Sequence, residues 1–216
     1  MKFNINEIMN DILNKINNGE IVYYNENQFQ FDLAWKIKER YGYDIKFEVV
    51  SEKQEDETKK NYTDLVVIGD GEYIGIELKY KTKSDPNIPL LKNQAAVGNS
   101  RYDFLWDICR LERFKSGSVN QFKYDTKYQE YEYLKGYAIF LTNDLSYTKC
   151  PRKNTLAVNL SIENGIKNKG EYAWLNPTES IKKSWRKNPI KFKYDYKFHW
   201  FPNEEDLKFK CLIVEV

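Results

Sequence analysis

Apolar residues recur at helical spacing in two segments near the N-terminus. From Ile5 to Ile16 they fall three or four positions apart, which predicts a short amphipathic helix. Asn4 begins a capping-box pattern at the start of this helix. A second helix is expected after Asn25, and it is expected to end at Gly42, a residue type favoured just past a helix C-terminus.

Further along the chain the pattern changes to strand-like runs. A polar, charged loop separates the first two runs, and a long helix opening with Ser100 precedes a buried strand. The expected strands are 43–50, 62–68, 72–80 and 136–144, with shorter ones at 155–160, 171–174, 197–201 and 210–216, and the expected long helix is 100–114. This order predicts an α/β fold with a mixed central β-sheet flanked by helices. We find no internal repeat and no low-complexity linker, so a single domain over residues 1–216 is expected.

A hairpin between the second and third of these runs carries the candidate chemistry. Asp70-Gly71 lies between two apolar segments, which favours a two-residue turn of the primed type. In that register facing positions sum to 141, so Asp64 lies opposite Glu77. Because side chains alternate faces along a strand, Lys79 is expected on the same side as these two acids.

Two ionised carboxylates facing each other in apolar surroundings are costly unless a cation lies near them. A divalent ion with oxygen ligands answers this requirement, and Mg²⁺ suits a site with few protein ligands and several waters. The alternative interpretation is an edge strand with a solvated charged face made of Glu77, Lys79, Lys81 and Lys83.

The distribution of charge adds a candidate partner. The net charge of the 216 residues is only +2, but residues 1–100 carry 13 basic against 17 acidic residues, and residues 101–216 carry 21 against 15. The segment 149–193 alone has 11 basic and 3 acidic residues. An acidic half beside a basic half suits a metal site next to a polyanion track. A solvated lysine-rich surface would give the same composition.

Several other classes of protein are disfavoured. The three cysteines are far apart and form no Cys-x-x-Cys pair, so neither a disulfide framework nor a zinc site is expected. The single histidine, His199, excludes histidine-rich metal chemistry. The N-terminus lacks the apolar core of a signal peptide and no run approaches the roughly 20 apolar residues of a membrane span. We therefore expect a cytoplasmic protein.

The segments TDLVVI and YIGIELKYK resemble the PD-(D/E)xK nuclease superfamily, whose restriction-endonuclease-like core is helix, three-stranded meander, helix, strand. The order of elements matches over about residues 20–145, which leaves 146–216 as an extension of the same domain. Residues 93–112 also resemble the helix region after the ExK strand of some uncharacterised bacterial members. Thr63 stands where the motif has Pro, and the Gln-x-x-x-Tyr motif of one branch is absent.

The resemblance implies a set of site residues. Asp64 matches the first acid of the motif, and Glu77 and Lys79 match (D/E)xK; Mg²⁺, which Mn²⁺ can replace, would be held by Asp64, Glu77 and the Leu78 carbonyl. Glu26 matches a Glu that many members place on the first core helix, with Glu20 as a weaker rival, and it would act as a further catalytic and metal-binding acid. Glu26 would also be favoured in the first turn of a helix for its interaction with the helix dipole. Gln94 and Arg101 are candidates for phosphate or metal-shell contacts, although Arg101 could equally be a surface residue.

These expectations lead to a metal-dependent phosphodiesterase, with DNA endonuclease as the favoured activity. The candidate substrate track contains Lys182, Lys183, Arg186 and Lys187. Two alternatives remain open: a catalytically silent nucleic-acid-binding or interaction domain of the same fold, and a nuclease specific for RNA or branched DNA. Cutting both strands of a duplex usually requires two active sites, so a homodimer is the expected assembly.

Overall fold

The computed structural model describes residues 3–51, 61–94, 96–116, 127, 130–167, 170–204 and 206–216. The helices are α1 (Ile5–Asn17), α2 (Glu26–Tyr41), α3 (Val97–Lys115), α4 (Glu179–Lys182) and the short 3₁₀ helix η2 (Trp185–Lys187). The strands are β1 (Asp44–Ser51), β2 (Asn61–Gly69), β3 (Glu72–Lys81), β4 (Glu132–Thr142), β5 (Glu171–Tyr172), β6 (Ile190–Lys191), β7 (Trp200–Phe201) and β8 (Lys210–Glu215).

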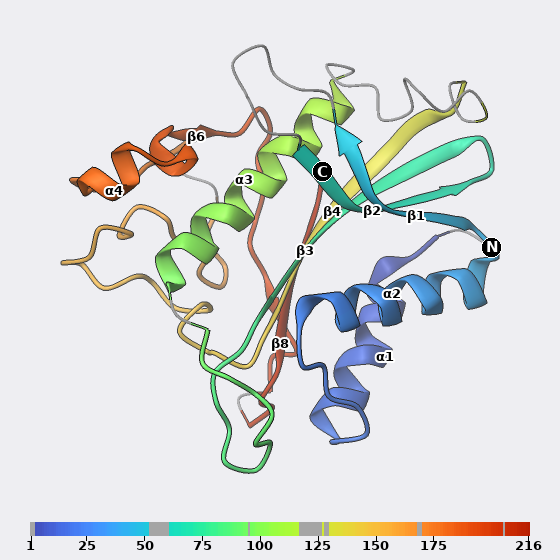
Figure 1. Cartoon of the computed structure of the whole chain (residues 1–216), viewed down its shortest axis with the longest axis horizontal. Helices are drawn as coiled ribbons and strands as arrows, with labels where there is room; N and C mark the ends of the chain where they lie inside the picture. The colour runs from blue at the N-terminus through green and yellow to red at the C-terminus, as the bar shows by residue number, and fades with distance from the viewer. Residues whose placement is uncertain are drawn as a thin grey trace.

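Six of these strands form one mixed sheet, in the order β1-β2-β3-β4-β8-β7. β1, β2 and β3 form an antiparallel meander, and α3 carries the chain from β3 to β4, which pairs with β3 in parallel. α1 and α2 lie on one side of the sheet and α3 on the other, with α4 and β6 beside α3 (Figure 1). The chain is therefore a mixed α/β protein with a helix-flanked sheet, as the sequence predicts.

The first two helices begin and end where their sequences indicate. The Asn4 side chain accepts a hydrogen bond from the Asn6 N–H, and the Asn25 side chain accepts one from the Gln28 N–H. Gly42 ends α2 in the left-handed conformation, with φ of 72°. Side-chain oxygens satisfy N–H groups that a helix start leaves free, and the cap at Asn25 makes Glu26 the first residue of α2.

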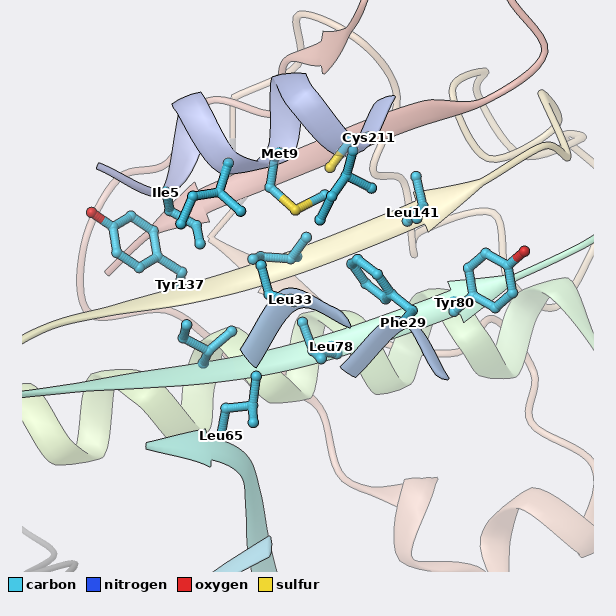
Figure 2. Packing of buried hydrophobic residues seen from close by; sticks show 14 of the residues in the cluster. Ile5, Met9, Phe29, Leu33, Leu65, Leu78, Tyr80, Tyr137, Leu141 and Cys211 are labelled. Carbon is cyan, nitrogen blue, oxygen red and sulfur yellow. The ribbon is translucent and has the colours of Figure 1, made fainter. Parts of the chain in front are cut away.

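β3 separates two hydrophobic cores. Its residues Ile76, Leu78 and Tyr80 pack into the core beneath α1 and α2, where Figure 2 shows side chains from both helices meeting those of β3, β4 and β8. The second core lies on the other face, between α3, β4, β8 and the C-terminal segment.

A pair of glycines brings α3 close to this second face. Gly75 of β3 and Gly136 of β4 are paired neighbours in the sheet. A Cβ at Gly75 would lie 3.1 Å from Leu111 Cδ2, and one at Gly136 would lie 3.0 Å from the same atom. Leu111 of α3 is thus seated in a notch that side chains at either position would fill.

The main differences from the sequence prediction lie after residue 95. α3 begins at Val97 with Ala96 as its N-cap, so Ser100 lies inside the helix and not at its start. β4 begins four residues before 136. The prediction of a strand at 155–160 is wrong, because that stretch forms consecutive turns. In the part of the chain that the structure describes, no helix is both long and apolar enough to cross a membrane.

Candidate functional site

The candidate site lies where β2 leaves β3. The hairpin has the expected register, from Gly69↔Glu72 to Leu65↔Ile76, and its turn residues Asp70 and Gly71 both have positive φ. The ladder ends at Leu65, and the next residue upstream, Asp64, uses its side chain in place of its backbone. Its Oδ2 accepts a hydrogen bond of 2.6 Å from the Leu78 N–H.

A second carboxylate binds the same edge of β3 two residues further on. Glu26, the first residue of α2, accepts a 2.6 Å hydrogen bond from the Tyr80 N–H. Along one strand the N–H groups of alternate residues point to the same edge, so Asp64 and Glu26 cover adjacent positions. Gln30, one turn along α2, donates to the Asp64 carbonyl at 2.7 Å.

Glu77 is almost fully buried, at 1% exposure. Its Oε2 accepts a hydrogen bond of 2.6 Å from Arg110 Nη2, whereas its Oε1 is buried without a hydrogen-bond partner. Burial raises the pKa of Glu77 well above its ordinary value, because the positive charge of Arg110 offsets the loss of water only in part. The negative charges of Asp64 and Asp107 add to the rise.

Lys79 lies on the same face as Glu77 and is held from two sides. Its Nζ is 2.7 Å from Asp107 Oδ2 and donates to the Leu78 carbonyl at 3.1 Å. Burial alone would lower the pKa of this amine, but the negative charges of Asp107, Asp64 and Glu26 outweigh burial and raise it. Lys79 is therefore a firmly protonated cation in this arrangement.

The pKa of Asp64 is raised from 3.8 to about 6, first of all by burial, with Asp107 and Glu26 adding to the rise. Lys79 and the hydrogen bond from Leu78 oppose it. The carboxyl thus titrates nearer to neutrality than an ordinary aspartate does.

The sequence argument expected a bound cation between the acids, but the protein supplies two cations of its own. Arg110 pairs with Glu77 and with Asp107, and Lys79 pairs with Asp107. Asp107 and Arg110 were missed in the sequence analysis. Their signal is a charged stripe of Asp103, Asp107 and Arg110 at helical spacing on a helix that is otherwise largely buried.

Gln30 of α2 and Glu48 of β1 were also missed. Gln30 donates a second hydrogen bond, of 3.2 Å, to Glu48 Oε1. Glu48 is a non-glycine residue with φ of 49° in β1, at the position that faces Asp64 when the β1–β2 register is continued through Phe47↔Leu65 and Val49↔Thr63. No feature of the sequence indicates this backbone conformation.

The hydrogen bonds of Gln94 and Arg101 in the described residues are made elsewhere. Gln94 lies in the connection between β3 and α3, where its backbone N–H donates to the Thr82 carbonyl. Arg101 is only 2% exposed, and its guanidinium donates to the carbonyls of Ser146 and Lys149. We conclude that Arg101 holds the loop after β4 in place.

The basic segment, as we call residues 149–193, packs along α3 through its described residues near Arg186. Arg186 forms a two-pronged ion pair with Asp103, at 2.6 and 2.8 Å, and Lys182 pairs with Glu179 on its own helix. Lys183 and Lys187 are exposed. Asp103 precedes Asp107 by four residues, and residues four apart on a helix are neighbours on one face. Arg186 therefore lies about one helical turn away from the ion pair of Asp107 with Lys79.

Two aromatic residues of this segment have different environments. Trp174 is partly buried against the second core, and its indole N–H donates to the Arg186 carbonyl at 3.1 Å. Trp185 is 48% exposed, with the Arg186 guanidinium over its ring. Of these two rings, that of Trp185 is the more exposed.

The donor atoms at this edge of β3 suit a hard divalent cation. Among the described residues no group of three or more His, Cys, Asp or Glu side chains is arranged to hold a metal ion. Mg²⁺ needs fewer, since it is usually bound through one or two carboxylates and several waters. The buried Glu77 Oε1 lacks a partner, and the Leu78 carbonyl adjoins the N–H that binds Asp64. Both are oxygen donors of the kind that such an ion takes, although the Leu78 carbonyl also accepts a hydrogen bond from Lys79.

Comparison of the chain with protein-family models, with curated proteins and with solved structures found no match.

Proposed function

We propose that this chain is a divalent-metal-dependent phosphodiesterase that cleaves nucleic acid, with DNA as the favoured substrate, and that its core is of the restriction-endonuclease-like type. The order of elements supports this proposal, because α2, the meander β1–β2–β3, α3 and the parallel strand β4 follow one another as the PD-(D/E)xK resemblance implies.

The observation that carries the proposal is the open edge of β3. Where β2 leaves β3, the Asp64 carboxylate binds the Leu78 N–H. The residues on either side of Leu78 are Glu77, which has one buried oxygen without a hydrogen-bond partner, and Lys79. A buried carboxylate oxygen without a partner costs free energy, and a bound divalent ion would satisfy Glu77 Oε1.

Each residue has a role in this proposal. Asp64, Glu77 and the Leu78 carbonyl would hold Mg²⁺, and Glu26 would extend the acidic edge. When bound, the ion lowers the pKa of its water and neutralises charge on the phosphate oxygens. Lys79, kept protonated by its acidic neighbours, orients the attacking water and stabilises negative charge, a role that suits a cation better than that of a general base.

The basic segment supplies the substrate contacts in this proposal. Lys182, Lys183, Arg186 and Lys187 would contact phosphates, which gives affinity without sequence readout. Two of them are already paired within the protein, Lys182 with Glu179 and Arg186 with Asp103. The exposed Lys183 and Lys187 would therefore make the first contacts.

One observation favours a second candidate function, a catalytically silent nucleic-acid-binding domain of the same fold. Arg110 already neutralises Glu77 within the protein, and no group of three acids is arranged around an ion in the described residues. In such a domain the ion pairs would stabilise the fold, and DNA would bind through the basic segment alone.

Cleavage of supercoiled plasmid in Mg²⁺ distinguishes the two functions. We expect nicking by the wild-type protein and a loss on the order of 100-fold in Asp64→Asn and Glu77→Gln, because each removes charge stabilisation at the reacting phosphate. Glu72→Gln is the matched control, since Glu72 is an exposed acid of the same strand at the hairpin turn. Binding of DNA without cleavage in either Mg²⁺ or Mn²⁺ would favour the silent domain.

A further inference from the structure

Two residues of α3 contact the Glu77-x-Lys79 pair, Arg110 through Glu77 and Asp107 through Lys79, and neither belongs to the proposed metal ligands. We propose that Asp107 and Arg110, which we call the α3 clamp, are positioning residues that hold Glu77 and Lys79 in the geometry for metal binding and cleavage. This inference rests on the proposed function and extends it to residues that the motif does not include.

Arg110 joins three parts of the fold. Its Nη2 donates to Glu77 Oε2 on β3 at 2.6 Å and to Asp107 Oδ1 on α3 at 2.8 Å. Its Nη1 donates to the Tyr62 carbonyl at 3.2 Å, two residues before Asp64 on β2. The planar guanidinium therefore fixes the end of β2 and the side chain of Glu77 relative to one helix.

The two oxygens of the Asp107 carboxylate contact two different cations, Arg110 and Lys79. Oδ1 accepts from Arg110, and Oδ2 is 2.7 Å from Lys79 Nζ. The Asp107 side chain is 4% exposed and that of Lys79 is 15% exposed, so water competes little for either group. Asp107 thus holds Lys79 of β3 and Arg110 of α3 beside each other through one carboxylate.

The clamp orients Glu77 as well as neutralising it. Arg110 occupies Oε2 and leaves Oε1 buried and without a hydrogen-bond partner, so the carboxylate has only one oxygen that remains free for a ligand. A lysine at position 110 would keep the positive charge, but a single ammonium cannot reproduce the planar fork that contacts Glu77, Asp107 and Tyr62 together. Exchange of Arg110 for Lys therefore separates orientation from charge.

The test is a titration of the 216-residue chain with Mn²⁺, in which the electron paramagnetic resonance signal of unbound Mn²⁺ reports the extent of binding. Partners that orient metal ligands typically contribute 10- to 100-fold to metal affinity, so we expect Arg110→Lys to bind Mn²⁺ about 10- to 100-fold more weakly. Arg113→Lys is the matched control, because Arg113 lies on the same helix with its guanidinium 4.9 Å from the centre of the Trp106 ring. Its affinity should equal that of the wild type.

A kinetic measurement adds a readout that lost stability alone would not give. We expect Arg110→Lys to lower the single-turnover rate of plasmid nicking, with the affinity for duplex DNA in the absence of metal unchanged. If Arg110→Lys does not fold, Asp107→Glu takes its place, since it keeps the charge and moves the carboxylate by one methylene; the same weakening is expected.

The outcomes separate the clamp from the proposed function. Wild-type affinity, or tighter binding, in a folded Arg110→Lys or Asp107→Glu protein would overturn the clamp and leave the function intact. A wild-type protein that neither binds Mn²⁺ nor cleaves DNA would overturn both.

Discussion

The two faces of β3 are built on opposite principles. Towards α1 and α2 the strand presents Ile76, Leu78 and Tyr80, all fully buried in an apolar core. Towards α3 it presents Glu77 and Lys79, which are paired with charged residues of that helix. The first face stabilises the fold by removing apolar area from water, whereas the second buries charges that must be compensated one by one.

This difference shows how a strand can separate stability from chemistry. Because neighbouring residues point to opposite faces, the side chain of Leu78 packs in the apolar core while its N–H binds Asp64 and its carbonyl accepts a hydrogen bond from Lys79. Substitutions on one face should therefore change the free energy of unfolding, and substitutions on the other should change metal binding.

The largest expected effect is on the apolar face. Leu78→Ala should lower the free energy of unfolding by about 2–5 kcal/mol, the range for a large-to-small change in a core, measured by urea denaturation. Mn²⁺ affinity of the folded protein should not change, because the ligand at this position is a backbone carbonyl. Leu78→Met, which conserves volume, should cost less than about 1.5 kcal/mol. Loss of Mn²⁺ binding in folded Leu78→Ala would show that the two faces are not independent.

The next effect concerns pH on the charged side. The pKa of Asp64 is raised from 3.8 to about 6, so the folded state holds its proton more tightly than the unfolded state does. The stability from this group is fully present below the unfolded pKa and is lost as the pH rises through about 6.

Asp64→Asn removes this titration. Relative to the Asn variant, the metal-free wild-type protein should lose on the order of 2–3 kcal/mol of unfolding free energy between about pH 3 and pH 7, measured by urea denaturation across that range. Glu77 is unchanged in both proteins and serves as an internal reference. If the unfolding free energies of the two proteins change in parallel across this pH range, the pKa of Asp64 is not raised in the folded state.

The smallest effect is expected at the start of α2, a helix on the apolar side of β3 that contributes the charged residue Glu26. Asn25 caps α2, and α2 presents Glu26 to the Tyr80 N–H. Asn25→Ala should cost about 1 kcal/mol, and Asn25→Ser, which keeps a capping oxygen, should cost much less. Hydrogen exchange at the Tyr80 amide should rise no more than about fivefold, the factor that corresponds to this loss. A much larger rise would mean that the cap, and not the packed face of α2, positions Glu26.

The sequence predicted the elements whose signals are local. The Asp70-Gly71 turn set the register of the hairpin, and the capping residues Asn4 and Asn25 set the starts of two helices. Asp64, Glu77 and Lys79 could be placed near one another for the same reason, because a register and an alternation of faces require only neighbouring residues.

Features that depend on distant contacts could not be predicted in this way. Nothing near Asp107 or Arg110 in sequence indicates that β3 supplies their partners, and Arg101 looked like a site residue although it binds carbonyls of a loop more than 40 positions away. The start of α3 was placed too late because Ser100 and Asp103 form a capping pattern, while the helix begins at Val97 without a side-chain cap. Asp103 instead pairs with Arg186, which is 83 residues away.

The glycine notch under α3 lets two residues without side chains affect the ion pairs between α3 and β3. Leu111, which lies against Gly75 and Gly136, directly follows Arg110 on α3. A methyl group at Gly75 would lie 3.1 Å from Leu111 Cδ2, and one at Gly136 would also lie too close to the Tyr133 hydroxyl, so we expect either to displace these side chains and to alter the packing of α3 on the sheet. The geometry of the ion pairs is thus expected to depend partly on Gly75 and Gly136, which bear no charge. A search for functional residues by chemical type alone would pass over these two glycines.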